Sequence, residues 1–287
     1  MNRTLLAAVF VFVAVIAASA SPREKIHREF TRTKERSLRV VIDIAFGSLM
    51  LEPGARDRIA TIEYDEAEDD EHKIIVSYDV SGDRGLLKIR LKKSSHFWGD
   101  GDSDRGGHDR QLAVRLTENL PVSLEIELGA GRGDIDLSRL RVEDLKISTG
   151  ASSVNVRCDQ PNPISANDVE FESGVSKFTA SNLSNMNFRS LKFSGGVGSY
   201  KLDFGGKLRQ NADVKIEVGL GSVVVNVPGE IPARLLYDDS WLSSFDLDDG
   251  FSKQRSGLYQ TDDFDGESNH LTIRIESGLG SVKVRRK

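Results

Sequence analysis

Two nearly identical stretches of sequence decide the fold: IEVGLGSVVV at Ile216–Val225 and IESGLGSVKV at Ile275–Val284. In each, apolar residues alternate with other residues on both sides of a Gly-x-Gly-Ser segment. Alternation with a period of two indicates a half-buried β-strand, and glycine permits the close backbone approach and unusual dihedral angles of a tight turn. The stretch therefore predicts a strand, a glycine turn and a second strand. A phosphate-binding loop would instead need a lysine and a following helix.

The same template recurs along most of the chain. Its copies span residues 38–51, 124–137, 145–156, 169–180, 191–202, 214–227 and 271–284. The first apolar residues after successive turns from Ile135 to Val223 are roughly 19 to 24 residues apart, a spacing typical of stacked repeats. Leucine-rich repeats share this spacing, but the connecting segments here carry turn residues without helical periodicity. We therefore expect an all-β fold, a single-stranded parallel β-helix (β-solenoid) of stacked strand–Gly turn–strand units.

The outward positions before each turn test this stacking. One position reads Glu125, Lys146, Glu170, Lys192 and Lys215, and the position two residues later reads Glu127, Ser148, Glu172, Ser194 and Glu217. In a parallel stack each residue lies ~4.8 Å from its counterpart. Opposite charges on neighbouring strands stabilise a sheet, so the alternation of sign along the first four members favours this register.

The N-terminus has the three parts of a cleavable secretory signal. Arg3 precedes an apolar run over residues 5–17, and small residues follow at Ala18 and Ala20. The run is shorter than the roughly 20 residues that span a bilayer. We expect a signal peptide at 1–20, a basic N-terminal segment at 21–37 and a β-solenoid domain at 38–287, with a long excursion at 229–270. The expected location is extracytoplasmic: the periplasm, the medium or the cell surface. No transmembrane segment is expected after signal removal.

Composition and motifs give little sign of chemistry. The net charge of −5 excludes a globally basic surface for nucleic acid. The single cysteine, Cys158, continues the inward parity of its strand and is expected to be buried. The histidines are scattered, so we assign no catalytic residue, cofactor or metal site. The acidic stretch at 64–71 is expected to be a solvated loop, whereas those at 98–107, 246–250 and 262–267 are incomplete as calcium loops, and the sequence leaves calcium binding at the acidic stretches open. Candidate glycan contacts are Trp98, Trp241, Asp100 and Asp102.

The segment from Val224 to Val284 carries a family resemblance. A strand ends in Pro228, a variable loop contains LSSFDL and LYQTDDFDGESNHLTI, and a Gly-x-Gly-Ser-Val strand closes the chain. This arrangement resembles the toast-rack and LiaF-like C-terminal families, which are akin to adhesin (auto-transporter adhesin-like) β-solenoid domains of bacterial envelope proteins. With the upstream repeats, the resemblance covers most of residues 35–287. It implies a fold and an envelope location and supplies no catalytic residues.

The leading functional hypothesis is an exported, non-enzymatic structural or interaction module that is adhesin-like or related to envelope stress. Its partner would be an unidentified envelope protein or glycan. The alternatives are a glycan-binding envelope protein and, less favoured, a polysaccharide-active enzyme. We also expect the 271–284 unit to pair with the 214–227 unit. The excursion should lie across the neighbouring rungs and bury its apolar residues, which are Trp241, Leu242, Phe245, Phe251 and Tyr259.

Overall fold

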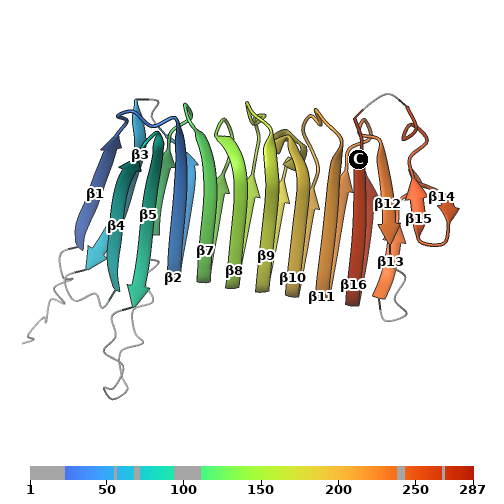
Figure 1. Ribbon diagram of the computed structural model, residues 1–287. Coiled ribbons are helices and arrows are strands. Elements are labelled where there is room, and N and C mark those ends of the chain that lie inside the picture. Colours follow the sequence, from blue (N-terminus) through green and yellow to red (C-terminus); the bar gives the residue numbers. More distant parts are fainter. Residues whose placement is uncertain (1–22, 55–56, 68–71, 94–110, 238–242, 267–268) are drawn as a thin grey trace, which may run out of the picture.

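The computed structural model describes residues 23–54, 57–67, 72–93, 111–237, 243–266 and 269–287. Within these ranges the regular elements are strands, apart from the short 3-10 segment η1 (Leu183–Met186). The strands form one continuous sheet, and its long members stand side by side in a row (Figure 1). The protein is therefore all-β, as the repeat predicts.

The centre of the sheet consists of long parallel strands, which we call rungs. They are β2 (Ser37–Pro53), β7 (Pro121–Asp136), β8 (Arg141–Arg157), β9 (Ala166–Ser181), β10 (Phe188–Asp203), β11 (Ala212–Val227) and β16 (Leu271–Arg286). Each rung pairs in parallel with the next in this order. The pairing of β11 with β16 runs from Ala212↔Leu271 to Val227↔Arg286, which confirms the predicted partnership of the two similar units.

Each rung is one continuous strand of 16 or 17 residues that bends at its glycines. The sequence predicted two strands separated by a turn. The strand continues because pairing with the neighbouring rungs resumes immediately beyond the bend, as in Val218↔Ser277 followed by Leu220↔Leu279. We call the two halves of a rung its first and second arms.

The core lies between the two arms. Alternate residues of each arm point inward, and in the middle of the stack they form an aromatic column of Phe171, Phe178, Phe193 and Tyr200. Consecutive ring centroids in this column are 5.1 to 5.4 Å apart. The rings touch both within a rung and between rungs, so the core binds each rung to the next.

At the N-terminal end, the rung beyond β2 is split into two strands. β5 (Arg84–Lys93) pairs in parallel with the first arm of β2, and β6 (Gln111–Leu116) pairs with the second arm. Antiparallel strands follow: β4 (His72–Ser81) on β5, β3 (Arg58–Ala67) on β6 and β1 (Arg23–Thr31) on β3. The parallel stack thus ends in antiparallel strands.

The C-terminal end is also a split rung, built from the excursion. β12 (Ala233–Tyr237) pairs with the first arm of β16 and β13 (Ser243–Leu247) with the second arm. β15 (Leu258–Gln260) is antiparallel to β12, and β14 (Ser252–Arg255) is antiparallel to β15. The excursion therefore extends the sheet beyond β16, whereas the sequence predicted that it lies across the rungs.

The five apolar residues of the excursion are buried to different degrees. Phe251 is buried, as expected, whereas Phe245 and Tyr259 are only half-buried and pack against the core. Trp241 and Leu242 lie outside the described residues. Because the excursion adds strands at the edge of the sheet, Phe245 and Tyr259 stay partly accessible to water.

Candidate interaction surface

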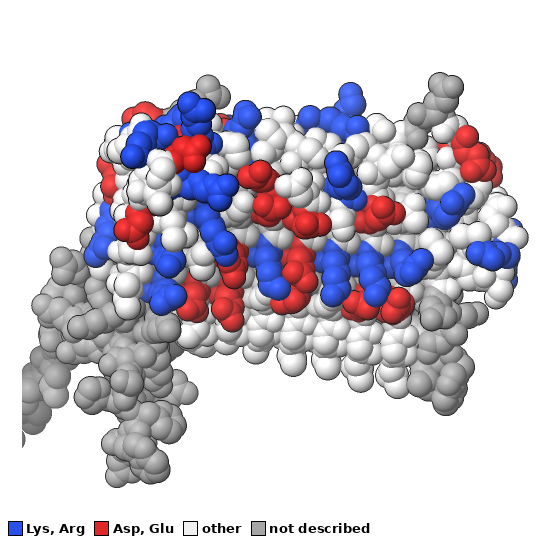
Figure 2. Space-filling model, in the orientation of Figure 1, with Lys and Arg blue, Asp and Glu red and all other residues white. Residues whose placement is uncertain are grey.

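A line of apolar side chains runs along the outside of the bend. Residues at the centre of the bend are in register from rung to rung and form what we call the ridge: Phe46, Ala130, Ala151, Val175, Val197, Leu220 and Leu279. Its five larger members are 45% to 64% exposed. At ~4.8 Å per rung the ridge is roughly 29 Å long. It forms the lower edge of the molecule, where uncharged protrusions are visible in Figure 2.

A groove accompanies the ridge on the side of the first arms. Its floor is a column of exposed glycines: Gly129, Gly150, Gly174, Gly196, Gly219 and Gly278. The groove crosses the rungs from β7 to β16 and has a volume of ≈ 990 Å³. Because glycine has no side chain, an apolar partner placed in this groove would contact bare backbone.

The outer wall of the groove is an acidic and hydroxyl-bearing column of Glu127, Ser148, Glu172, Ser194, Glu217 and Glu276. Beside it lies the charged column that contains Lys146, Glu170, Lys192 and Lys215, which crosses the face shown in Figure 2. The structure confirms both predicted columns and their register.

Ion pairs join the two columns. Lys146 Nζ is 3.1 Å from carboxylate oxygens of both Glu170 and Glu172, and Lys215 Nζ is 2.7 Å from Glu217 Oε1. The Ser148 hydroxyl donates to Glu172 at 2.8 Å. These hydrogen bonds, from Ser148 first and then from Lys146, hold the pKa of Glu172 below its ordinary value. Glu172 therefore stays ionised at neutral pH.

The opposite flank of the ridge is rich in serine and carries two cations. This column, at the start of the second arms, reads Ser48, Arg132, Ser153, Lys177, Ser199, Ser222 and Ser281. Arg132 and Lys177 are exposed. The ridge thus separates an acidic flank from a flank of hydroxyl and basic groups.

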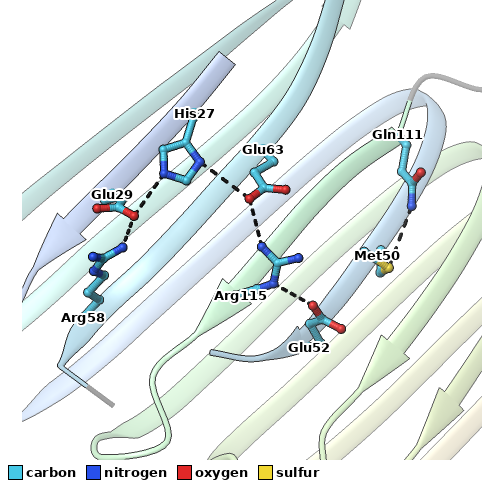
Figure 3. A network of polar contacts seen from close by, with 8 residues as sticks. All are labelled: His27, Glu29, Met50, Glu52, Arg58, Glu63, Gln111 and Arg115. Carbon is cyan, nitrogen blue, oxygen red and sulfur yellow. Dashed lines mark hydrogen bonds and ion pairs between the residues drawn. The ribbon is translucent and has the colours of Figure 1, made fainter. Parts of the chain in front are cut away.

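A second polar cluster lies at the N-terminal end, on β1, β3, β6 and β2 (Figure 3). Arg115 donates to Glu52 at 2.7 Å and to Glu63 at 3.0 Å, and these hydrogen bonds raise the pKa of Arg115. His27 Nε2 is 3.0 Å from Glu29, which also pairs with Arg58. These contacts tie four strands together, so we interpret the cluster as a clamp on the N-terminal end.

Cys158 is buried, as predicted. Desolvation, followed by the nearby Asp136 carboxylate, raises the pKa of its thiol to about 12. The thiol is therefore protonated at neutral pH and is a poor nucleophile. Over the described part of the chain, no group of three or more His, Cys, Asp or Glu side chains is arranged to hold a metal ion.

The candidate glycan contacts Trp98, Trp241, Asp100 and Asp102 all lie outside the described residues. Of the acidic stretches, 246–250 is described in full, whereas 64–71 and 262–267 are described in part, and residues 64–67 belong to strand β3 and not to a loop. In the 246–250 stretch, Asp246 and Asp248 both pair with Arg285 of β16, which leaves them engaged in fixing β13 to its neighbour. The structure thus assigns these two carboxylates a structural role.

The sequence reasoning missed the ridge, although a signal for it was present. In each copy of the template an apolar residue directly follows the first glycine or its equivalent, as Val197 follows Gly196 and Leu220 follows Gly219. The prediction treated this residue as part of the turn and assigned it no exposed surface. This position does not belong to the alternating inward-facing positions of either arm. An apolar residue that recurs there in every copy therefore indicates a side chain that faces outward.

The family of the chain follows from sequence comparison. The family described as the N-terminal domain of toast_rack, DUF2154, matches residues 18–181 and 168–226. These matches cover more than half of the chain, so the protein belongs to the toast-rack family, in agreement with the resemblance in its repeats. No curated protein matches the chain. Within the described ranges, none of the helical segments has the length and apolar character needed to cross a bilayer.

Two solved bacterial structures illustrate the likeness of other folds to this chain. One is a "putative cell adhesion protein" from Clostridium sporogenes, with 15% identity and a TM-score of 0.47, over 93% of this chain and 100% of that one. Another is a "putative adhesin" from Bacteroides fragilis, with 13% identity and a TM-score of 0.38, over 91% and 97%. At these scores the likeness carries no inference about function.

Proposed function

We propose that the protein is an exported, non-enzymatic interaction module of the bacterial cell envelope, and that the ridge is its docking surface. The observation that carries this proposal is the line of apolar side chains along the seven rungs, five of which carry a large exposed residue at this position. A large apolar patch exposed to water is unfavourable in a soluble protein and marks interaction sites.

The fold itself does not explain the ridge. The core between the arms is filled by inward side chains, and the ridge residues lie outside it. A serine at each ridge position would suit the water-exposed bend equally well, as it does in the column that begins at Ser48. Contact with another molecule accounts for apolar residues at these positions.

The same site can be tested in the cell by photo-crosslinking. A photoreactive phenylalanine analogue at Val197 reports on the ridge, and one at Lys201 reports on the exposed face of the second arm of the same rung. We expect an adduct from position 197 and none from position 201. Equal adducts from both positions, or none from position 197, would contradict the proposal.

Export is the second part of the proposal, and it rests on the N-terminal sequence. Fractionation of cells together with the intact mass of the protein tests it. We expect a mature chain that begins at Ser21 in the extracytoplasmic fraction. A full-length chain in the cytoplasm would overturn this part. The identity of the adduct from position 197 decides between adhesion and a role in envelope stress, and a glycan adduct would favour the alternative of glycan binding.

A further inference from the structure

The ridge and the groove are complementary to each other. We propose that the docking surface takes a second copy of this chain, related by a two-fold axis that runs along the ridge, so that the ridge of each copy lies in the glycine groove of the other. This inference rests on the proposed function of the ridge and names its partner.

Shape is the first argument. The ridge and the floor of the groove are adjacent columns of the same rungs, as Val197 is adjacent to Gly196 and Leu220 to Gly219. They therefore run parallel and share the same spacing of ~4.8 Å. A two-fold axis along the ridge keeps each rung opposite the same rung of the partner. When one ridge side chain between β7 and β16 fits over the bare backbone of the groove, the others on these rungs fit as well, whereas Phe46 of β2 would face Ala45 beyond the end of the groove.

Charge is the second argument, because the two flanks of the ridge carry opposite charge on the same rungs. β7 has Glu127 on the groove side and Arg132 on the serine side, and β9 has Glu172 and Lys177 in the same positions. The proposed axis brings the groove flank of one copy toward the serine flank of the other. Glu127 then faces Arg132 of the partner subunit, and Glu172 faces the partner's Lys177.

The charges also exclude the other two-fold arrangement. An axis perpendicular to the ridge, through the central rung β9, would bring the two acidic flanks together. Glu172 would then face its own counterpart, and Glu127 would face the partner's Glu217. Like charges across an interface are unfavourable, so the charge pattern selects the axis along the ridge.

The size of the contact predicts its strength. A strip roughly 29 Å long and about one side chain wide belongs to the smallest class of specific interfaces, below about 1,200 Å² of buried surface. We therefore expect a reversible dimer with a dissociation constant on the order of micromolar.

Sedimentation equilibrium of the protein expressed from its complete reading frame tests the proposal. We expect a monomer–dimer equilibrium over the micromolar range. The double variant Val197→Ser with Leu220→Ser should raise the dissociation constant at least about tenfold, because it removes the centre of the apolar contact. Lys201→Ser, on the same rung as Val197 but away from the bend, should leave the constant unchanged. Thermal unfolding of each variant verifies that the fold is retained.

A charge exchange tests the orientation. Glu127→Arg and Arg132→Glu should each weaken the dimer, since each places like charges across the proposed axis. The double variant should regain most of the lost affinity. If the dissociation constant of the double variant is raised by the product of the two single-variant factors, the proposed axis is wrong.

A monomer at every concentration would overturn the dimer. If the protein is a monomer in solution but position 197 still forms an adduct in cells, the proposed interaction module is retained and its partner is a molecule other than a second copy of this chain. Two results together would instead reject the ridge as the docking surface. These are the absence of a crosslink from position 197 in cells, and a dimer in solution whose dissociation constant is unchanged by Val197→Ser with Leu220→Ser. The two proposals can therefore fail separately.

Discussion

Glycine is required at the bend for two different physical reasons. In the groove column, a Cβ atom would meet the carbonyl oxygen of the neighbouring rung, at 2.2 Å for Gly150 and 2.4 Å for Gly278 but at 3.0 Å for Gly219. Two positions further along the chain, Gly47, Gly131, Gly221 and Gly280 have φ between 131° and 144°, which side chains of L-residues rarely adopt. A Cβ atom at Gly221 would also lie 1.9 Å from the Gly198 carbonyl oxygen of the neighbouring rung. Backbone geometry fixes glycine at this position.

The first prediction compares two glycines of one rung. Gly221→Ala should destabilise the protein strongly, by roughly 3 kcal/mol or more, because it combines backbone strain with a clash against fixed backbone. Gly219→Ala should cost less, since its Cβ would lie 3.0 Å from the nearest atom, the Gly196 carbonyl oxygen. Urea unfolding of both variants measures the difference. Equal destabilisation would contradict the distinct roles of the two columns.

The second prediction concerns Glu172, whose pKa lies below the ordinary value of 4.5. A lowered pKa in the folded state means that ionisation favours folding. This contribution is present above the ordinary pKa and is lost as the pH falls through the lowered value. Between about pH 5 and pH 3, the wild type should therefore lose more stability than Glu172→Gln.

The difference should be small, about 0.5 kcal/mol, because the side chains of Glu172 and Lys146 are both 43% exposed and water screens the pair. Urea unfolding across this pH range measures it. Asp213→Asn, at an exposed outward position of β11, is the control and should follow the wild type. If Glu172→Gln loses stability with falling pH as steeply as the wild type, the lowered pKa of Glu172 does not contribute to the pH dependence of folding.

At the scale of the element, both ends of the stack must cover the exposed edge of the last parallel rung. An open strand edge exposes unpaired N–H and C=O groups that recruit other chains. At both ends a split rung is followed by antiparallel strands, β4, β3 and β1 at one end and β15 and β14 at the other. Arg285 of β16 pairs with Asp246 at 2.5 Å and Asp248 at 3.0 Å, which fixes β13 on the last rung.

The third prediction tests the C-terminal end. Phe245 stacks on Tyr237 with ring centroids 4.1 Å apart and contacts Tyr259 at 5.6 Å. Phe245→Ala should cost about 2 kcal/mol, since the ring is half-buried. Hydrogen exchange should show lost protection in β12 and β13 while β9 and β10 remain protected. Ser244→Ala, which removes only a long 3.5 Å hydrogen bond from an exposed hydroxyl to the Gly280 carbonyl oxygen, should change exchange far less. Uniform loss across all rungs would contradict a local effect.

At the scale of the whole molecule, each rung contacts mainly its two neighbours. Stability in such a stack is close to a sum of terms for single rungs and for adjacent pairs. Phe178 of β9 and Phe193 of β10 have ring centroids 5.4 Å apart, whereas Phe245 lies on β13, beyond β10, β11 and β16. Coupling between side chains should therefore fall off with the number of rungs between them.

The fourth prediction expresses this as a pair of double-mutant cycles. Phe178→Ala should cost about 3–5 kcal/mol. Combined with Phe193→Ala, the two losses should depart from additivity by about 0.5 kcal/mol or more. Combined with Phe245→Ala, they should add within about 0.5 kcal/mol. Urea unfolding of the single and double variants checks both cycles, and strong coupling to Phe245 would show that the stack does not behave as neighbouring pairs.

The parts of the fold that the sequence predicted are those that repeat. Recurrence of the template revealed the parallel stack, and the alternating charges of Glu125, Lys146, Glu170 and Lys192 revealed its register. The ends do not repeat, so nothing in the sequence of β1 indicates that it pairs antiparallel with β3, about 35 residues further on. Local alternation identifies a strand and leaves its partner unspecified.

The candidate site was harder to predict for a similar reason. Tryptophans beside aspartates suggested glycan contacts at Trp98 and Trp241, because such residues stand out individually. The ridge residues are ordinary when taken one at a time: Ala130, Val175 and Leu220 are common apolar residues. They become a surface only when stacking brings positions from all the rungs into one line.

The uniform rung has a consequence for the dimensions of the molecule. Each added copy of the template would insert one rung between neighbours of the same shape and would leave both end structures untouched. The length of the stack is then set by the number of repeats, and the structure of its two ends does not depend on that number. Duplication of a single repeat would lengthen the ridge by one side chain and the groove by one glycine, so the reach of the surface can change in equal steps while its cross-section stays constant.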